Sequence, residues 1–258
     1  MNSSALYIHI PAHMLPDRLP FLLERQLQPE VACQDVTLDE LDFDLLGDCA
    51  ARLREKGLGT TLHAPYSGFH PGGHSVRERE QSRKLADRSL DLAEKLQACR
   101  IIFHPGLAYG SDGEALDDWV QQNLAFWPEF MPRAEALNCT ICLENIYETT
   151  PQIFTRLLEE LHSPFIGHVF DIGHWNMFAD GKLEDWLDAT ARYLKHLHLH
   201  DNHGRRDEHL AIGRGTVPFS RLFDWLLEKR PTTTITLENH ELSDAEQSLR
   251  SIQPFLRD

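Results

Sequence analysis

Histidine and carboxylate side chains recur along this chain where short apolar segments end. Imidazole nitrogens and carboxylate oxygens are the side-chain atoms that commonly bind divalent metals in proteins. Seven residues combine such a side chain with such a position: His63, His104, Glu144, Asp171, His174, His198 and Glu238. Asp207 and His209, in the polar segment after the seventh predicted strand, bring the set to nine. If the fold brings these segment ends together, the nine side chains form one cluster that binds divalent metal.

Three histidines alternate with two leucines in the segment 195–202, KHLHLHDN. In a strand this alternation places His196, His198 and His200 on one face and the leucines on the other, where we expect them to meet outer helices. A buried row of imidazoles carries a desolvation cost unless each ring is coordinated or hydrogen-bonded. We expect His196 to be a hydrogen-bonded core residue and His198 to bind metal.

Two pairs among these nine residues lie close together in the sequence. Asp207 and His209 lie two residues apart, so both side chains of an extended loop can turn toward the same ion. Asp171 and His174 lie three apart at a strand end, where the aspartate could also cap a helix. Five other histidines lack such neighbours, and we expect them at the surface or in loops: His70, His74, His162, His168 and His203.

Short apolar segments rich in β-branched and aromatic residues alternate with longer stretches of helical periodicity, which is typical of repeated βα units. The eight predicted strands are Ala5–Ile10, Glu30–Cys33, Gly59–His63, Arg100–His104, Thr140–Glu144, Gly167–Phe170, His196–His200 and Thr234–Glu238. Helix starts are predicted at capping boxes of Ser111 with Glu114 and of Ser243 with Glu246. The second strand carries the weakest signal.

The length of 258 residues fits a single α/β domain over residues 1–258, folded as one (β/α)₈ barrel or TIM barrel. An open doubly wound sheet is the alternative, but no GxGxxG motif follows the first strand. In a barrel the C-terminal ends of the strands build the active site, so the metal-type residues become neighbours around one pocket.

The composition limits the partners and the compartment. Lys and Arg total 25 against 40 Asp and Glu, a net charge of −15, which disfavours nucleic acid and anionic membranes as partners, although bound metal would offset part of that charge. No signal peptide or membrane span is recognisable, so we expect a cytoplasmic protein. Cys139 and Cys142 form one CxxC inside an apolar strand, and we expect both in the core. The sequence carries no signal for an oligomeric state.

The motifs at these positions resemble the xylose isomerase-like barrel superfamily, which includes sugar and sugar-phosphate isomerases and epimerases and the endonuclease IV family. They are LHAPY at 62–66, FHPG at 103–106, LEN at 143–145, DIGH at 171–174, HLHDN at 198–202, DEH at 207–209 and LEN at 237–239. The resemblance covers nearly the whole chain.

This resemblance implies three groups of ligands. Glu144, Asp171, His198 and Glu238 would surround a central ion, as in the sugar enzymes of the superfamily. In the endonuclease IV arrangement a second ion would be bound by His63, His104 and Glu144, and a third by His174, Asp207 and His209. The implied cofactor is one to three ions of Zn, Mn, Mg or Co per chain.

Two reactions compete for this site. In the favoured interpretation a small sugar or sugar phosphate is isomerised or epimerised through an enediolate, with Glu144 and Glu238 as acid and base. The alternative is a di- or trinuclear zinc phosphoester hydrolase that resembles endonuclease IV and uses all nine ligands. A non-catalytic binding barrel is least favoured, because we would expect such a protein to have lost some of the ligand residues, and the full set is present. The candidate substrate contacts are Tyr66, Trp175, His200, Arg205 and Arg214.

Overall fold

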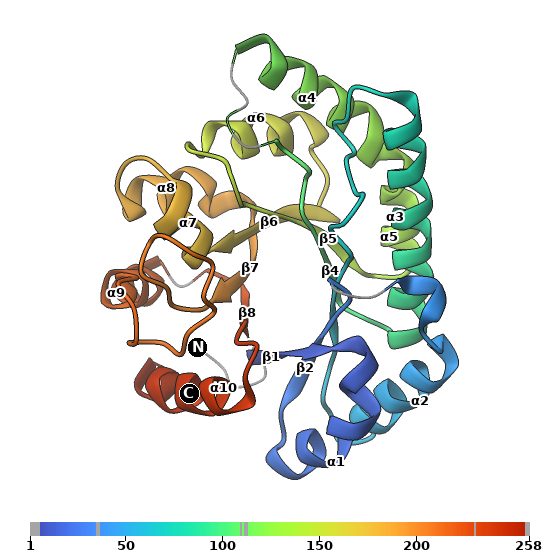
Figure 1. Cartoon of the computed structure of the whole chain (residues 1–258), viewed down its shortest axis with the longest axis vertical. Helices are drawn as coiled ribbons and strands as arrows, with labels where there is room; N and C mark the ends of the chain where they lie inside the picture. Colours follow the sequence, from blue (N-terminus) through green and yellow to red (C-terminus); the bar gives the residue numbers. More distant parts are fainter. Residues whose placement is uncertain (1–5, 35–36, 109, 111–112, 230, 256–258) are drawn as a thin grey trace.

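Eight parallel strands close into one barrel in the order β1 to β8, and β1 pairs with β8 (Figure 1). This computed structural model describes residues 6–34, 37–108, 110, 113–229 and 231–255. The strands are β1 Leu6–Pro11, β2 Gln28–Ala32, β3 Thr61–His63, β4 Arg100–Phe103, β5 Thr140–Glu144, β6 Ile166–Asp171, β7 Leu194–Leu199 and β8 Thr234–Leu237. The predicted (β/α)₈ barrel is confirmed.

Helices surround the barrel on its outer side (Figure 1). They are α1 Leu15–Arg25, α2 Phe43–Arg54, α3 Val76–Leu96, α4 Gly113–Phe126, α5 Met131–Ala136, α6 Gln152–Leu161, α7 Ile172–Phe178, α8 Leu183–Thr190, α9 Phe219–Lys229 and α10 Leu242–Ile252. Short 3-10 helices lie at Ala12–Met14, Leu38–Glu40, Trp127–Glu129, Ala191–Tyr193 and Gln253–Phe255. Among the described residues, none of these helices combines the length and the apolar character that a membrane crossing requires.

All eight predicted strands exist, with small shifts at their ends. The weakest prediction, the second strand, is real and begins two residues earlier, at Gln28. Ala5 and Ser111 lie outside the described residues. The capping box predicted at Ser243 is wrong, because α10 begins at Leu242 and its N-cap, Glu241, makes no side-chain hydrogen bond. A capping box is instead formed by Ser75 and Glu78 at the start of α3.

The alternation along β7 separates an apolar outer layer from a polar interior. Leu197 and Leu199 are fully buried in the large apolar cluster shared by strands and helices. His196 faces the next strand, where its Nδ1 lies 2.6 Å from the hydroxyl of Thr234 and its Nε2 lies 2.8 Å from that of Thr236. The prediction that His196 is a hydrogen-bonded core residue is therefore confirmed.

Candidate metal centre

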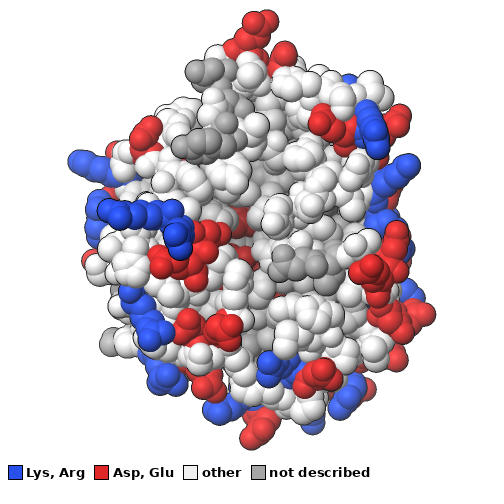
Figure 2. Space-filling view, viewed as in Figure 1, with Lys and Arg blue, Asp and Glu red and all other residues white. Residues whose placement is uncertain are grey.

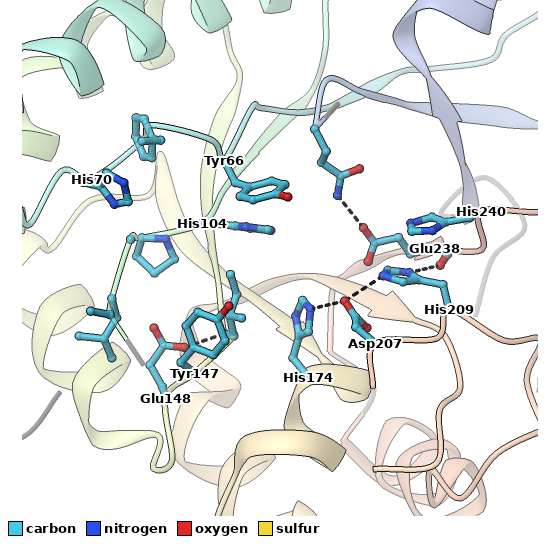
Figure 3. A pocket seen from close by; sticks show the side chains of 17 residues that line it. Tyr66, His70, His104, Tyr147, Glu148, His174, Asp207, His209, Glu238 and His240 are labelled. Carbon is cyan, nitrogen blue, oxygen red and sulfur yellow. Dashed lines mark hydrogen bonds and ion pairs between the residues drawn. The ribbon is translucent and has the colours of Figure 1, made fainter. Parts of the chain in front are cut away.

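A cavity of about 520 Å³ opens at the C-terminal ends of the strands (Figure 3). Metal-type side chains form much of its lining, and Phe69, Pro105, Leu107 and Ile146 add apolar surface to it. Among the nine predicted ligands, five line the cavity directly: His104, His174, Asp207, His209 and Glu238. The other four lie beneath them, fully buried: His63, Glu144, Asp171 and His198. The predicted convergence of the strand ends on one pocket therefore exists.

The central group is organised around the imidazole of His198. Its Nδ1 lies 3.1 Å from Oε1 of Glu144 and 3.1 Å from Oε2 of Glu238. Oδ2 of Asp171 lies 3.8 Å from the same nitrogen. Strands β5, β6, β7 and the end of β8 thus bring three carboxylates to one atom of one histidine.

Two more histidines approach Glu144 from the preceding strands. Nε2 of His63 lies 3.1 Å from Oε2 of Glu144, and Nε2 of His104 lies 3.2 Å from the same oxygen. The two carboxylate oxygens of Glu144 therefore face different histidine groups, a geometry in which one carboxylate can bridge two ions.

An outer group lies at the mouth, around Asp207. Its Oδ2 lies 3.2 Å from Nε2 of His174 and 3.0 Å from Nε2 of His209 (Figure 3). The Nδ1 atoms of both histidines are occupied elsewhere, since His174 donates to the carbonyl oxygen of Asn145 and His209 to that of Glu238. This arrangement directs both Nε2 atoms toward Asp207.

The side chain of Asp201 anchors the loop that carries Asp207 and His209. Its fully buried carboxylate accepts four backbone N–H groups, from Asn202, Gly213, Gly215 and Val217. A Cβ atom at Gly215 would lie 2.2 Å from the carbonyl oxygen of Asn202, so this approach requires glycine. The two glycines of the IGRG segment therefore allow the backbone to approach Asp201 and hold the loop in place.

Opposing charges shift the titration of the central group. Burial alone would lower the pKa of His198, but the charges of Glu144, Glu30 and Glu238 outweigh burial and hold the pKa well above its ordinary value. Burial would likewise raise the pKa of Glu144, but the charge of His198 and the contacts of His104 hold it well below the ordinary range. Glu144 is therefore a carboxylate, able to bind a cation or accept a proton.

Several ligand-type atoms are buried without a hydrogen-bond partner in the described part of the chain. They include Oδ2 of Asp171, Oε2 of Glu238 and Nε2 of His104, whose close contacts with charged neighbours lack hydrogen-bond geometry. A buried polar atom without a hydrogen bond costs free energy. Several such atoms that converge on one point are what a metal-binding site shows when no ion is included. The residues present therefore fit a divalent metal in their number, chemistry and placement.

The structure adds residues that the sequence interpretation missed. Glu30 of β2 is fully buried and lies 3.1 Å from His198. Gln34 donates a hydrogen bond of 3.1 Å to Oε1 of Glu238. His240 stacks on His209 with ring centroids 3.9 Å apart, and Glu148 lines the cavity on the side opposite Glu238 (Figure 3). Burial raises the pKa of Glu148 to about 7.

The predicted substrate contacts are distributed unevenly. Tyr66 lines the cavity and stacks on His104. His200 is fully buried beside Asp171. Trp175, Arg205 and Arg214 are not among the described residues that line the cavity, and Arg214 donates instead to Asp244 at 3.0 Å. Their proposed contact with substrate gains no support from these positions.

One histidine assignment is wrong, and the core assignment of the cysteines is right. His168, expected at the surface or in a loop, is fully buried and packs on Phe154 of α6. It lies on β6 at a position whose side chain faces outward from the barrel, so it meets the helix layer. Cys139 and Cys142 are free and buried, as expected.

A barrel with a histidine and carboxylate cluster at the C-terminal ends of its strands defines a class of candidate metalloenzymes. Residues 29–258 match the model of the xylose isomerase-like TIM barrel family, and the chain belongs to this family. Two uncharacterized proteins of Methanocaldococcus jannaschii are similar in sequence. MJ1614 is 26% identical over 249 residues, 94% of each chain; MJ1311 is 27% identical over 202 residues, 76% of this chain and 69% of its own length.

Solved structures share the fold over nearly the full length. The TTHB071 protein of Thermus thermophilus, in a structure obtained by soaking with ZnCl₂, is 26% identical with a TM-score of 0.82 and 97% of each chain covered. A D-tagatose 3-epimerase-like protein is 23% identical with a TM-score of 0.84, covering 98% of this chain and 97% of its own. A D-psicose 3-epimerase in the presence of D-fructose is 13% identical with a TM-score of 0.78, covering 98% and 99%.

Proposed function

We propose that this protein is a divalent-metal-dependent epimerase or isomerase of a small sugar, acting in the cytoplasm. The observation that carries the proposal is the placement of Glu144 and Glu238 at the floor of the cavity. Oε1 of Glu144 and Oε2 of Glu238 each lie 3.1 Å from Nδ1 of His198. Two carboxylates at one point can remove a proton from a carbon and return one to it. The shared fold with sugar epimerases supports this reaction class.

Glu144, Asp171, His198 and Glu238 would hold the central ion. When bound, the ion would polarise the sugar carbonyl and so acidify the neighbouring C–H group. Gln34 holds Oε1 of Glu238 by a hydrogen bond, which orients that carboxylate. Glu144 and Glu238 serve as base and acid, one accepting the proton and the other delivering one.

The charge of the cavity favours a neutral sugar over a sugar phosphate. Among the described residues that line it, there is no Lys or Arg, and three are acidic: Glu148, Asp207 and Glu238. Figure 2 shows acidic atoms inside the central hollow and most Lys and Arg side chains toward the periphery of this face. A phosphate group would find no Lys or Arg side chain to pair with in this lining, so it would depend mainly on bound metal.

Exchange of carbon-bound hydrogen with solvent tests the proposed reaction. The metal-loaded protein is incubated in D₂O with D-fructose, D-tagatose, D-psicose or L-ribulose, and deuterium on the carbons beside the carbonyl is followed by NMR. We expect exchange with at least one ketose, reduced by about 100-fold or more in Glu144→Gln and Glu238→Gln. Glu208→Gln, which changes an exposed carboxylate paired with His203, is the matched control and should exchange normally. Absence of exchange with every ketose would contradict the proposal.

A second candidate is a di- or trinuclear zinc phosphoester hydrolase. The observation that favours it is the presence of both additional histidine groups, His63 with His104 on Glu144 and His174 with His209 on Asp207. Its test is hydrolysis of bis(p-nitrophenyl) phosphate and of an oligonucleotide with an abasic site by the zinc-loaded protein. Hydrolysis that is lost in His63→Ala and in His209→Ala would replace the leading proposal; a rate equal to that of the metal blank would remove this candidate.

A further inference from the structure

His200 is a fully buried imidazole whose two ring nitrogens have no hydrogen-bond partner within the described residues. Its Nε2 lies 3.2 Å from Oδ1 of Asp171 and 3.6 Å from Oδ1 of Asp207. These contacts lack hydrogen-bond geometry, and a buried imidazole without a hydrogen bond carries a desolvation cost, which binding of a cation at Nε2 would reduce.

Three histidines, not two, converge on Asp207. The Nε2 atoms of His174, His209 and His200 lie 3.2, 3.0 and 3.6 Å from its carboxylate oxygens. For His174 and His209 the Nδ1 atom is held by a backbone carbonyl oxygen, at 3.0 and 2.7 Å. Metal-binding histidines usually donate their second ring nitrogen in this way, which leaves the first nitrogen free for the ion.

Two neighbouring residues fix the position of the His200 ring. A Cβ atom at Gly173 would lie 2.0 Å from Cε1 and 2.4 Å from Nε2 of His200, so only glycine leaves room for this ring. On its other side the ring stacks on His209, with centroids 4.0 Å apart and planes 18° apart. The absence of a side chain at Gly173 and the stacking on His209 together orient the imidazole of His200.

We propose that His200 is a metal ligand that completes an outer site with His174, Asp207 and His209. This inference rests on the proposed function only in requiring that the cluster binds metal, and it adds a ligand to the three that the family resemblance implies there. The outer site then has three imidazoles and one carboxylate, a set suited to tetrahedral Zn²⁺ or Co²⁺. The central site has three carboxylates and one imidazole, a set better suited to Mn²⁺ or Mg²⁺.

Cobalt spectroscopy tests this assignment without reference to activity. Metal-free protein is titrated with Co²⁺, whose four-coordinate complexes absorb strongly in the visible range. We expect strong absorption for one ion per chain in the unmodified protein, and its loss in His200→Phe with a fall of about tenfold or more in Co²⁺ affinity. Phe fills the same space and can stack on His209, but it offers no lone pair.

Two further variants complete the test. Gly173→Ala retains His200 but displaces its ring, and should weaken the absorption in the same way. His203→Ala removes an exposed histidine of the same loop and should leave the spectrum unchanged.

Full absorption and unchanged affinity in His200→Phe would overturn the inference. An unmodified protein that binds no Co²⁺ or Zn²⁺ would overturn the proposed metal dependence as well. An intact cobalt spectrum without sugar exchange would contradict the proposed reaction alone.

Discussion

Nε2 of His198 lies 3.1 Å from Oε1 of Glu30, and neither side chain has exposed surface. The negative charge beside Nε2 favours the proton on that nitrogen, which leaves Nδ1 to face Glu144 and Glu238. Glu30 is itself held by the hydroxyl groups of Thr61 and Thr236, at 3.1 and 2.9 Å. The ring orientation of the central histidine therefore depends on a residue from the opposite part of the barrel.

Glu30→Gln removes this charge and keeps the shape of the side chain. We expect a fall of about 10- to 100-fold in affinity for Mn²⁺ or Zn²⁺, because partners of metal-binding histidines tune ligand basicity by that amount. Competition with a chelator measures the affinity, and the ¹⁵N shifts of the His198 ring report its tautomer. Equal affinity and an unchanged tautomer in the variant would show that Glu30 is only a structural residue.

Asp201→Ala should release the loop that carries the outer ligands. Four backbone N–H groups lose their acceptor, so we expect the free energy of unfolding to fall by about 3 kcal/mol. The metal content of the outer site should also fall, while the central site keeps its ion. The control is Asp244→Asn, which removes only an ion pair with the half-exposed Arg214 and should cost less than about 1 kcal/mol. Urea unfolding and metal analysis measure both effects.

The stability of the fold should decrease in mild acid because of His168. Burial lowers the pKa of His168 from 6.5 to about 4 in the folded protein, so the unfolded chain binds its proton at higher pH. The stabilising effect of the neutral ring is complete above about pH 6.5 and is lost progressively as the pH falls toward 4. Between pH 7 and pH 5 this residue alone should cost about 2 kcal/mol.

His168→Asn gives the matched comparison for this effect. The Nδ1 atom of His168 lies 3.0 Å from the carbonyl oxygen of Leu143, and the asparagine amide can donate to the same oxygen without titrating. The unfolding free energy of the variant should therefore fall less steeply between pH 7 and pH 5. Parallel pH profiles for the two proteins would contradict a buried neutral histidine.

The sequence predicted the barrel and the nine converging residues because both depend on local patterns. Apolar segments with polar ends predict strands, and parallel strands in a barrel place their C-terminal ends at one rim. Glu30 was missed because its partners His196 and His198 lie on β7, far away in the sequence. His168 was misassigned although the alternation along β6, with Asp171 facing the site, places it on the outer face.

The loop residues show a second limit of local patterns. Arg214 between two glycines is compatible with a substrate contact, yet the glycines are required by the carboxylate of Asp201. His200 was expected to contact substrate; in the structure it is fully buried beside Asp171 and is not among the described residues that line the cavity. Neither the depth of a side chain below the cavity nor a bond to a distant backbone amide is encoded in residue spacing.

The central claim is that these histidines and carboxylates form a divalent-metal centre, and elemental analysis tests it most directly. The protein is reconstituted with Zn²⁺ and Mn²⁺ in excess, desalted, and analysed beside Glu144→Gln and Glu208→Gln. We predict at least one ion per chain in the unmodified protein and in Glu208→Gln, with the central ion lost in Glu144→Gln. A folded, unmodified protein that retains no divalent ion would contradict the account.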